Sequence, residues 1–265
     1  MNRNELTTAV LISTYNWPEA LELVLLSLLK QTRLPNEILI ADDGSAATTK
    51  ALIDRYRSLF SIPIKHAYQE DKGFRKCLIL NKAIKLAEAE YIIEIDGDII
   101  VNPKFIADHI HAATNGYFVQ GSRAMLTEVK TKEILKTRKI NLHSLSKGIY
   151  SRFNAFRIPL FSIFFNPNPY SSWNVKGCNL AFWRDDYIKV NGYNNDFKGW
   201  GWEDYEFAAR LINSGILKKR LKMAAISYHV FHKIYDRGNF LPNELIYRQT
   251  INEKYTYCKD GYNEV

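Results

Sequence analysis

An α/β fold, with an open and mostly parallel sheet flanked by helices, is predicted by three observations on this chain of 265 residues. Short continuous apolar runs at 9–12, 37–41 and 91–95 have the pattern of parallel strands that are buried on both faces. Segments with helical spacing separate these runs, as the crossovers of a parallel sheet require. All three runs end in polar residues, and such sheets bind ligands at the carboxyl ends of their strands.

The first strand is predicted at 9–12, where Ala9-Val10-Leu11-Ile12 leads into the polar turn 13–16. Pro18 suits the first turn of the helix that follows, because its missing N–H is not needed there. The apolar side chains of this helix share one face, as expected of a helix that packs on a sheet. They are Leu21, Leu25, Leu28 and Leu29.

The strand at 37–41 is closed by Asp42-Asp43-Gly44-Ser45. The series then continues with a helix at 46–59, a strand at 62–64, a helix at 74–87 and a strand at 91–95. This last strand delivers the sequence Asp96-Gly97-Asp98. Because the ends of parallel strands meet at one edge of a sheet, we expect the polar clusters at 14–16, 42–43 and 96–98 to line that edge.

The segment from 127 to 170 differs in composition, because it is first basic and then both aromatic and basic. Two interpretations remain equal here: a core helix with a solvated basic face, or an element at a membrane surface. The second interpretation rests on residues 147–165. No internal repeat or low-complexity tract is apparent.

The C-terminal part contains three further predicted elements. Residues 174–183 have the pattern of a strand, and a helix is predicted from Glu203 until Gly215 stops it. The run 224–232 is predicted to be a last strand, with His229 and His232 at its end.

The formal net charge of +8 at pH 7 favours anionic partners, although charge alone does not choose among nucleic acids, phosphorylated molecules and acidic membranes. Cys77, Cys178 and Cys258 are far apart, so reduced thiols in a cytoplasmic protein are expected. The first residues lack the apolar stretch of a signal peptide, and no apolar run is long enough to span a bilayer. We therefore expect any membrane contact to be peripheral, at the inner face of the cell membrane.

Asp96-Gly97-Asp98 offers two oxygen ligands around a flexible glycine, which suits magnesium or manganese on a phosphorylated ligand. The same tripeptide is also a common tight turn. Its place after a fully apolar strand, opposite a second acidic strand end, favours the metal site. His229 and His232 would add imidazole, which suits manganese better than magnesium.

Glu203, Asp204 and Glu206 fall in a predicted first helical turn, where carboxylates also serve as simple caps. Capping needs one carboxylate and gives no reason for Gly199-Trp200-Gly201-Trp202 directly before them. Two indoles separated by glycine describe a flap that stacks on a sugar and brings up a base. The sequence therefore favours a catalytic acidic pair here.

A nucleotide site is predicted near the first strand ends. Tyr15 offers a flat ring for a nucleobase, and Asp43 offers an acceptor for its imide, whereas Asp42 is more typical of a helix cap. Lys72, Arg75 and Lys76 precede a helix, where they would supply positive charge for phosphates or simply form an exposed basic turn.

With these residues in hand, almost the whole chain resembles family 2 of the inverting nucleotide-sugar glycosyltransferases, which have the GT-A fold. The N-terminal part is similar through 13–16, Gln31-Thr32, 42–45, Gly73-Phe74-Arg75-Lys76 and 96–98. The C-terminal part is similar to the galactosyltransferase-like module of chondroitin polymerases and β-1,4-galactosyltransferases. The similar segments there are 176–182, 199–204 and Tyr228-His229.

The resemblance implies roles in donor and metal binding. Tyr15 and Asp43 would hold uracil, and Asp96 would contact the ribose or a water on the metal. Asp98 and His229 would bind Mn²⁺ or Mg²⁺ on the diphosphate, since His229 matches the family's histidine better than His232. The other predicted donor-binding residues are Thr14, Asn16 and Arg75.

The resemblance also implies that Asp204 is the catalytic base and that Glu203 positions the acceptor. The predicted acceptor-binding residues are Trp200, Gly201, Trp202 and Asn179. Related galactosyltransferases have Gly-Trp-Gly-Gly before the acidic pair, whereas Trp202 takes the last position here. This departure leaves open which acceptor and which donor sugar the resemblance implies.

The expected function is therefore metal-dependent, inverting transfer of a hexose (galactose, glucose or an N-acetylhexosamine) from a UDP-sugar to a bacterial surface glycan or glycolipid, as in lipopolysaccharide, capsule or O-antigen. One continuous domain would hold a nucleotide-sugar-binding half at 1–125, a connecting segment at 126–172 and an acceptor-binding, catalytic half at 173–265. The alternative is a basic nucleotide- or nucleic-acid-binding module without transferase activity. Acidic residues cluster where its phosphates would lie, so no nucleic-acid partner is expected.

Overall fold

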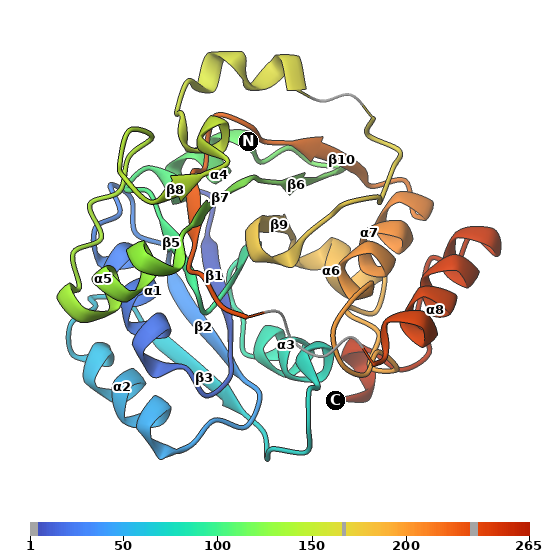
Figure 1. Ribbon diagram of the computed structural model, residues 1–265. Helices are drawn as coiled ribbons and strands as arrows, with labels where there is room; N and C mark the ends of the chain where they lie inside the picture. Colours follow the sequence, from blue (N-terminus) through green and yellow to red (C-terminus); the bar gives the residue numbers. More distant parts are fainter. Residues whose placement is uncertain (1–4, 166–167, 234–237) are drawn as a thin grey trace.

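The computed structural model describes residues 5–165, 168–233 and 238–265. Its centre is a seven-stranded sheet in the order β10-β6-β9-β4-β1-β2-β3, with helices on both faces (Figure 1). Four neighbouring strands are mutually parallel, namely β1 (Thr8–Thr14), β2 (Glu37–Asp42), β3 (Ile64–Tyr68) and β4 (Tyr91–Asp96). β9 (Leu180–Trp183) lies antiparallel between β4 and β6 (Tyr117–Gln120), and β10 (Leu217–Arg220) is parallel to β6. The predicted α/β class with a mostly parallel sheet is confirmed.

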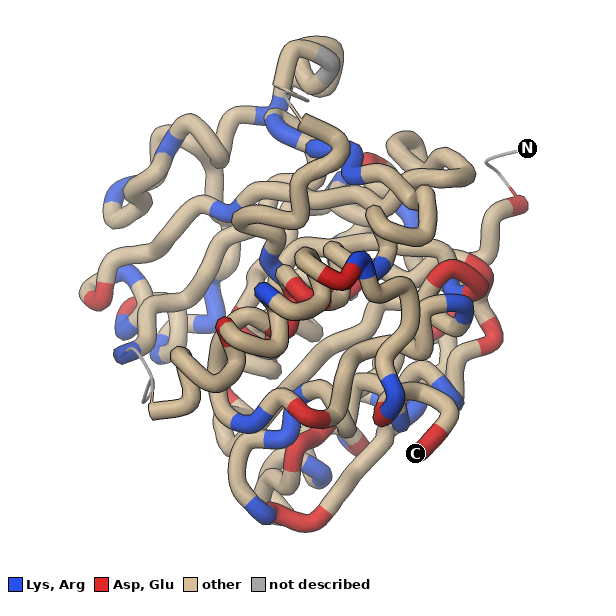
Figure 2. The backbone as a smooth tube through the Cα atoms, turned by 90° about the vertical axis from the view of Figure 1, so that its right-hand side faces the viewer, with Lys and Arg blue, Asp and Glu red and all other residues tan. Residues whose placement is uncertain are grey.

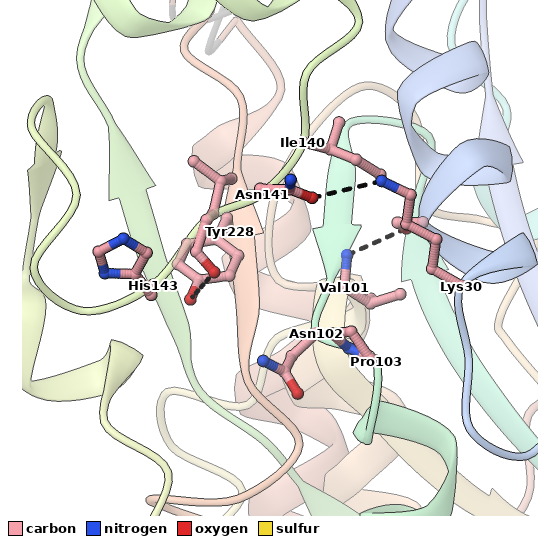
Figure 3. Close-up of a pocket in the computed structure, with 10 residues that line it drawn as sticks. Lys30, Val101, Asn102, Pro103, Ile140, Asn141, His143 and Tyr228 are labelled. Carbon is pink, nitrogen blue, oxygen red and sulfur yellow. Dashed lines mark hydrogen bonds between the residues drawn. The ribbon is translucent and has the colours of Figure 1, made fainter.

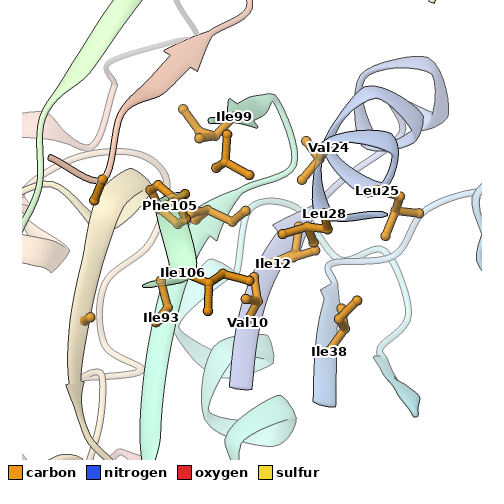
Figure 4. Close-up of a cluster of buried hydrophobic side chains, with 14 of the residues drawn as sticks. Val10, Ile12, Val24, Leu25, Leu28, Ile38, Ile93, Ile99, Phe105 and Ile106 are labelled. Atoms are coloured by element: carbon orange, nitrogen blue, oxygen red, sulfur yellow. The ribbon is translucent and has the colours of Figure 1, made fainter. Parts of the chain in front are cut away.

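The continuous apolar runs exist because the sheet is covered on both sides. Val10 and Ile12 of β1 face α1 (Pro18–Leu29), α2 (Ala47–Arg57) and α4 (Phe105–Ala112), in the cluster shown in Figure 4. Ala9 and Leu11 point to the other side, toward α3 (Lys76–Lys85), α6 (Arg184–Lys189) and α7 (Glu203–Asn213). Successive side chains of a strand point to opposite faces, so a strand buried on both sides must be apolar throughout.

A second sheet of four short strands has the order β5-β11-β7-β8. Its strands are β5 (Ile99–Val101), β11 (Ser227–His229), β7 (Arg123–Leu126) and β8 (Ile149–Tyr150). β11 pairs antiparallel with β5, which begins directly after Asp98, and His229 lies opposite Ile99. This pairing carries a residue of the C-terminal part to the end of β4.

The two outer helices are α5 (Glu128–Thr137) and α8 (Phe240–Asn252). α8 packs along α7, where the Thr250 hydroxyl donates to the buried Glu206 carboxylate at 3.1 Å. No helix in the described part of the chain is both long and apolar enough to cross a membrane.

Several predicted boundaries shift for local reasons. The strand expected at 62–64 runs instead from Ile64 to Tyr68, because Pro63 has no N–H and contributes only its carbonyl to Ile38 of β2. The strand expected at 174–183 is limited to β9, since Asn174 has a left-handed φ of 62° and a 3-10 helix occupies Gly177–Asn179. The last strand is likewise shortened to β11 after Ala225, whose φ is 46°.

Among its described residues, the segment from 127 to 170 contains one α-helix, α5. α5 buries only Thr131 and Ile134 among its ten residues. Beyond β8 the chain forms two 3-10 helices, Arg152–Ala155 and Pro159–Phe165, and several large apolar side chains there are exposed. The interpretation as a core helix with a basic face fits α5 alone, because Ile134 joins a buried cluster while Lys132 and Lys136 are exposed. It does not fit the aromatic part at 150–165.

Candidate active site

The predicted polar clusters meet at one edge of the central sheet. In the strand register, Ser13 of β1 lies beside Asp96 of β4, and Thr14 lies beside Asp42 of β2. The Ser13 hydroxyl donates to Asp96 Oδ1 at 2.9 Å. Gly97 then turns the chain so closely past β1 that a Cβ there would lie 2.9 Å from the Ser13 carbonyl oxygen. Glycine at this position lets Asp96 and Asp98 leave the strand in different directions.

Asp98 forms a cluster with His229, the last residue of β11, and with His232, which follows the strand. Its Oδ2 lies 3.6 Å from Nε2 of His229 and 3.3 Å from Nε2 of His232. One ligand atom from each of the three residues lies within 4.8 Å of the others, the arrangement that a shared cation needs. Both histidines therefore lie near Asp98, and distance alone does not choose between His229 and His232 as the ligand.

The hydrogen bonds of the two imidazoles suit a metal site. Nδ1 of His229 donates to the Val230 carbonyl, and Nδ1 of His232 donates to the Lys233 carbonyl, each at 2.8 Å. A neutral imidazole held in this tautomer presents the lone pair of Nε2, here toward a carboxylate. Oδ1 of Asp98 is buried and lacks a hydrogen-bond partner among the described residues. A divalent cation would satisfy this donor set of one carboxylate and two imidazoles.

Asp204 belongs to a second, acidic cluster built by α7, β4 and the turn before β9. Oδ2 of Asp204 accepts the Gly177 N–H at 2.7 Å, and Oδ1 accepts the Tyr193 hydroxyl at 3.3 Å. The Tyr193 hydroxyl also lies 3.0 Å from Oε2 of Glu94. A Cβ on Gly177 would lie 2.7 Å from both carboxylates, so glycine is the residue that lets Asp204 and Glu94 approach.

The hydrogen bonds of Asp204 show whether its carboxylate caps α7 or points away from that helix. The Asp204 carboxylate binds an N–H of a different segment, and the N-cap of α7 has no side-chain hydrogen bond. Glu203 accepts the Gly201 N–H at 2.9 Å, within the preceding turn. Glu206 pairs with Arg210 inside the same helix. Only Asp204 therefore points its acid out of α7 toward β4.

Lys76 connects the two clusters. Its Nζ lies 2.7 Å from Asp96 Oδ1, and the charges of Asp204, Glu94 and Glu203 also act on it. Burial opposes its charge, but these carboxylates outweigh burial and hold the pKa of Lys76 well above its usual value. The sequence left two interpretations for this lysine, charge for phosphates or an exposed basic turn. The structure instead places its largely buried side chain in an ion pair with Asp96.

Burial controls the protonation of the acidic cluster. It raises the pKa of Asp204 above the ordinary value and raises the pKa of Glu94 much further. Burial and the charge of Asp204 raise the pKa of Glu203 to about 7. Asp96 behaves differently, because the Lys76 ammonium overcomes burial and lowers its pKa to about 2. Carboxyls with such divergent pKa values in one place are typical of acid–base sites.

At the predicted uracil site, the side chains already form some hydrogen bonds within the protein. Asp43 is buried and already accepts the Arg75 N–H at 2.7 Å and the Gln69 amide at 2.6 Å. Tyr15 is 45% exposed, and its hydroxyl donates to Asp71 at 2.8 Å. Its ring is therefore available to a ligand, whereas Asp43 has only its remaining lone pairs to offer.

Asn16 and Arg75 mainly hold loops in place. Asn16 has a left-handed φ of 45°, and its side-chain oxygen accepts the Ala46 N–H at 2.8 Å, just before α2. The Arg75 guanidinium donates to the Glu70 carbonyl, while its Nε is buried and has no partner among the described residues. Thr14 is buried at the end of β1.

The two indoles before Asp204 pack against α8 and its flank. Trp200 is 39% exposed and lies parallel to Phe240, at 6.2 Å between ring centroids. Trp202 adopts a left-handed φ of 72° at the N-cap of α7 and stacks on Tyr247 at 5.2 Å. The family's glycine would fit this backbone without strain, so ring packing must offset a cost of about 1–2 kcal/mol for tryptophan here.

Asn179 lies apart from the exposed surface. It is 1% exposed, and its amide donates to the Ser122 carbonyl at 2.8 Å and bonds to Nε2 of His109 at 2.9 Å. A Cβ on Gly121 would lie 2.2 Å from the same amide. Asn179 thus connects the start of β9 to neighbouring segments through buried hydrogen bonds.

Sequence reasoning missed the roles of Glu94, Tyr193 and Gly177. A signal existed for Glu94, because a carboxylate inside the apolar run Tyr91-Ile92-Ile93-Glu94-Ile95 is costly without a partner. Gly177 lies in the segment 176–182 that carries the resemblance, but nothing in the sequence places Gly177 or Tyr193 beside β4.

Two cavities lie next to these clusters rather than in them. One of about 300 Å³ is bounded by the end of α1, β5 and residues 140–143, where Lys30 Nζ donates to Asn141 at 3.4 Å (Figure 3). The other, of about 230 Å³, is lined by Trp173, Trp202, Tyr247 and the C-terminal end of α8. The second cavity adjoins the turn that carries Asp204.

Two family models match this chain. The model of glycosyl transferase family 2 matches residues 9–175, and that of the N-terminal domain of galactosyltransferase matches 161–233. Because the first match covers more than half of the chain, the chain belongs to glycosyl transferase family 2.

Curated relatives are similar over most of this chain. The validoxylamine A glucosyltransferase of Streptomyces hygroscopicus subsp. limoneus is 27% identical over 78% of the chain and 48% of its own length. The chondroitin synthase of Escherichia coli is 23% identical over 83% of the chain and 34% of its own length. The chain thus spans about half or less of the length of these two relatives.

Solved structures confirm the GT-A fold. Residues 1–349 of TarS from S. aureus superpose with a TM-score of 0.62 at 17% identity, over 93% of this chain and 66% of that one. The mannosyltransferase PcManGT from Pyrobaculum calidifontis, in complex with GDP-Man and Mn²⁺, gives 0.59 at 16% identity, over 85% and 57%.

Proposed function

We propose that this protein transfers a hexose from a UDP-sugar to a hydroxyl of a bacterial surface glycan or glycolipid, with inversion. The main support for the proposal is that the structure contains two different clusters of functional side chains. The ion pair of Asp96 with Lys76 lies between them. One is the set of candidate metal ligands Asp98, His229 and His232, and the other is the half-buried acid Asp204.

Asp98 and the two histidines would hold Mn²⁺ or Mg²⁺ against the donor diphosphate. When bound, the ion stabilises negative charge on the leaving nucleotide as a Lewis acid. Asp204 would take the proton of the attacking acceptor hydroxyl, and the Gly177 N–H keeps its carboxylate in place. Displacement from the side opposite the diphosphate inverts the anomeric centre. Tyr15 and Asp43 would hold the base, while Trp200, Gly201 and Trp202 would face the acceptor.

The choice of a UDP-sugar draws on relatives as well as on Tyr15 and Asp43. TarS has been solved with UDP and with UDP-GlcNAc, and poly(ribitol-phosphate) β-N-acetylglucosaminyltransferase TarS of Staphylococcus aureus is 28% identical over 38% of this chain. Hyaluronan and chondroitin synthases among the relatives favour a polysaccharide acceptor. We also propose that the enzyme acts in the cytoplasm at the inner face of the cell membrane.

The proposal is tested with a panel of nucleotide sugars, in which release of nucleotide is measured with Mn²⁺, with Mg²⁺ and with chelator. We expect ion-dependent release from at least one UDP-sugar. An ion at about a hundredfold its dissociation constant should also raise the free energy of unfolding by about 2.7 kcal/mol. Both effects should disappear in Asp98→Ala and persist in Asp185→Ala, which removes an exposed carboxylate of α6. Equal release and equal Tm shift in the two variants would refute the metal assignment.

A further inference from the structure

The part of the chain around the second 3-10 helix, Pro159–Phe165, has an unusual surface. This helix projects from the rest of the molecule and is the yellow helix at the top of Figure 1. Leu160 is 85% exposed, Phe164 74%, Phe161 51% and Phe153 50%. We call these four side chains the apolar surface. Large exposed apolar groups close together mark sites where a protein meets another apolar phase.

The backbone of this helix is fixed independently of its aromatic rings. The Ile158 N–H donates to the Met223 carbonyl at 2.8 Å, and the Arg157 guanidinium donates to the buried Asp108 of α4 at 2.9 Å. Phe161 and Phe164 contact each other at 6.0 Å between centroids instead of entering the core. The anchoring therefore holds the apolar side chains outward.

The segment of the chain that carries the apolar surface is rich in cations and lacks acidic residues of its own. Residues 134–184 contain no Asp or Glu, although the whole chain has 28, and they contain eight Lys and Arg. In Figure 2 the projecting helix carries no acidic position. Lys222 lies 4.6 Å from the ring centroid of Phe153, which brings an ammonium to the edge of the apolar surface. Lys147 and Arg152 are exposed in the preceding turns.

We propose that the apolar surface docks this protein on a membrane that contains anionic lipid. Exposed rings and a leucine would enter the boundary between headgroups and acyl chains, while the flanking cations would meet lipid phosphates. A second copy of the chain fits less well, because a symmetric contact would bring the same cations against each other. The proposal concerns lipid binding alone and stands whether or not glycosyl transfer is confirmed.

Vesicle flotation of the full chain tests it, using phosphatidylcholine with and without phosphatidylglycerol. We expect flotation with the anionic vesicles, little with the neutral ones, and loss in high salt. The triple variant Leu160→Ser, Phe161→Ser, Phe164→Ser should reduce binding by about tenfold or more, because three apolar groups no longer enter the bilayer. The matched control Val129→Ser, Leu241→Ser, Leu245→Ser changes three equally exposed side chains elsewhere and should float like the wild type.

All altered side chains are exposed, so circular dichroism should show equal folding of both triple variants. Failure of the wild type to float would overturn the proposal, as would equal flotation of the two triple variants. A wild-type dimer that the apolar-surface variant converts to a monomer would also overturn it, by showing that a second copy covers these residues. Nucleotide release is measured separately, so a failed transferase assay leaves this result interpretable.

Discussion

Asp204 is placed by one backbone amide and one hydroxyl, from Gly177 and Tyr193. Both donors lie outside α7, so they fix the direction of the carboxylate relative to the sheet edge. A general base must be held where the acceptor proton arrives, and a precise position matters as much as its pKa.

Asp204→Asn should lower turnover by about 10² to 10⁴-fold, because the amide keeps the shape and loses the base. UDP binding, measured by calorimetry, should stay within experimental error of the wild type. Asp185→Asn makes the same chemical change in the first turn of α6 and should keep full turnover. Near-normal turnover of Asp204→Asn would remove it from the role of base.

The acidic pair predicts a specific pH dependence. Burial raises the pKa of Glu203 to about 7 and that of Asp204 above its usual value, so both lose their protons at higher pH than ordinary carboxyls. A base must be deprotonated, so kcat/KM should rise with pH through an inflection above the ordinary range of an aspartate and be lost below it. The inflection belongs to the pair as a unit.

Glu203→Gln removes one negative charge beside Asp204 and should move this inflection to lower pH. The measurement is kcat/KM of nucleotide-sugar turnover against pH for both proteins. An inflection that stays in place in Glu203→Gln would show that a group outside the pair controls the rate.

The turn before β9 acts as one wall of the acidic cluster. A Cβ on Gly177 would lie 2.7 Å from Asp204 and 2.7 Å from Glu94, although Gly177 has no left-handed φ. Glycine is thus required at this position because a side chain would collide with two carboxylates. The backbone conformation itself does not require glycine.

Gly177→Ala should push Asp204 away and reduce turnover by about a hundredfold, as displacements of about 1 Å commonly do. The contrast is Gly116→Ala, where a Cβ meets open space and only the φ of 77° opposes the change. That variant should lose about 1–2 kcal/mol of stability and keep its turnover. Turnover and Tm of both variants separate the two effects. If Gly177→Ala kept the turnover of Gly116→Ala, the turn before β9 would have moved to make room for the Cβ without displacing Asp204.

The elements differ in how well the sequence predicted them. The buried strands β1, β2 and β4 and the helices α1 and α7 carry long signals, and each was predicted within a few residues. The strands of the second sheet have two to four residues, which is too short for a periodic pattern to emerge. Their pairing is decided by contacts between distant parts of the chain.

The candidate site was predictable where residues stand at strand ends. Asp96 and Asp98 follow the apolar run of β4. His229 ends the apolar run of β11, and the pairing of β11 with β5 brings it next to Asp98. Lys76 carried no such signal, since nothing before folding shows that its ammonium will be buried beside Asp96. Asn179 illustrates the opposite case: its motif matched the acceptor-binding set, while packing gives it a buried hydrogen-bond network.

At the scale of the whole molecule, the central sheet is shared by both parts of the chain. β9 lies between β4 and β6, and β10 completes the far edge beyond β6. The segments 1–125 and 173–265 are therefore not separate folding units, because strands of one pair with strands of the other.

The order in which the strands of the central sheet occur along the chain has a consequence during synthesis. As the nascent chain leaves the ribosome, β4 and β6 have emerged with exposed hydrogen-bonding edges, and the strand that separates them arrives only with residues 180–183. Open edges of this kind invite pairing with other chains, so the interval between residues 120 and 180 is when a chaperone would matter most.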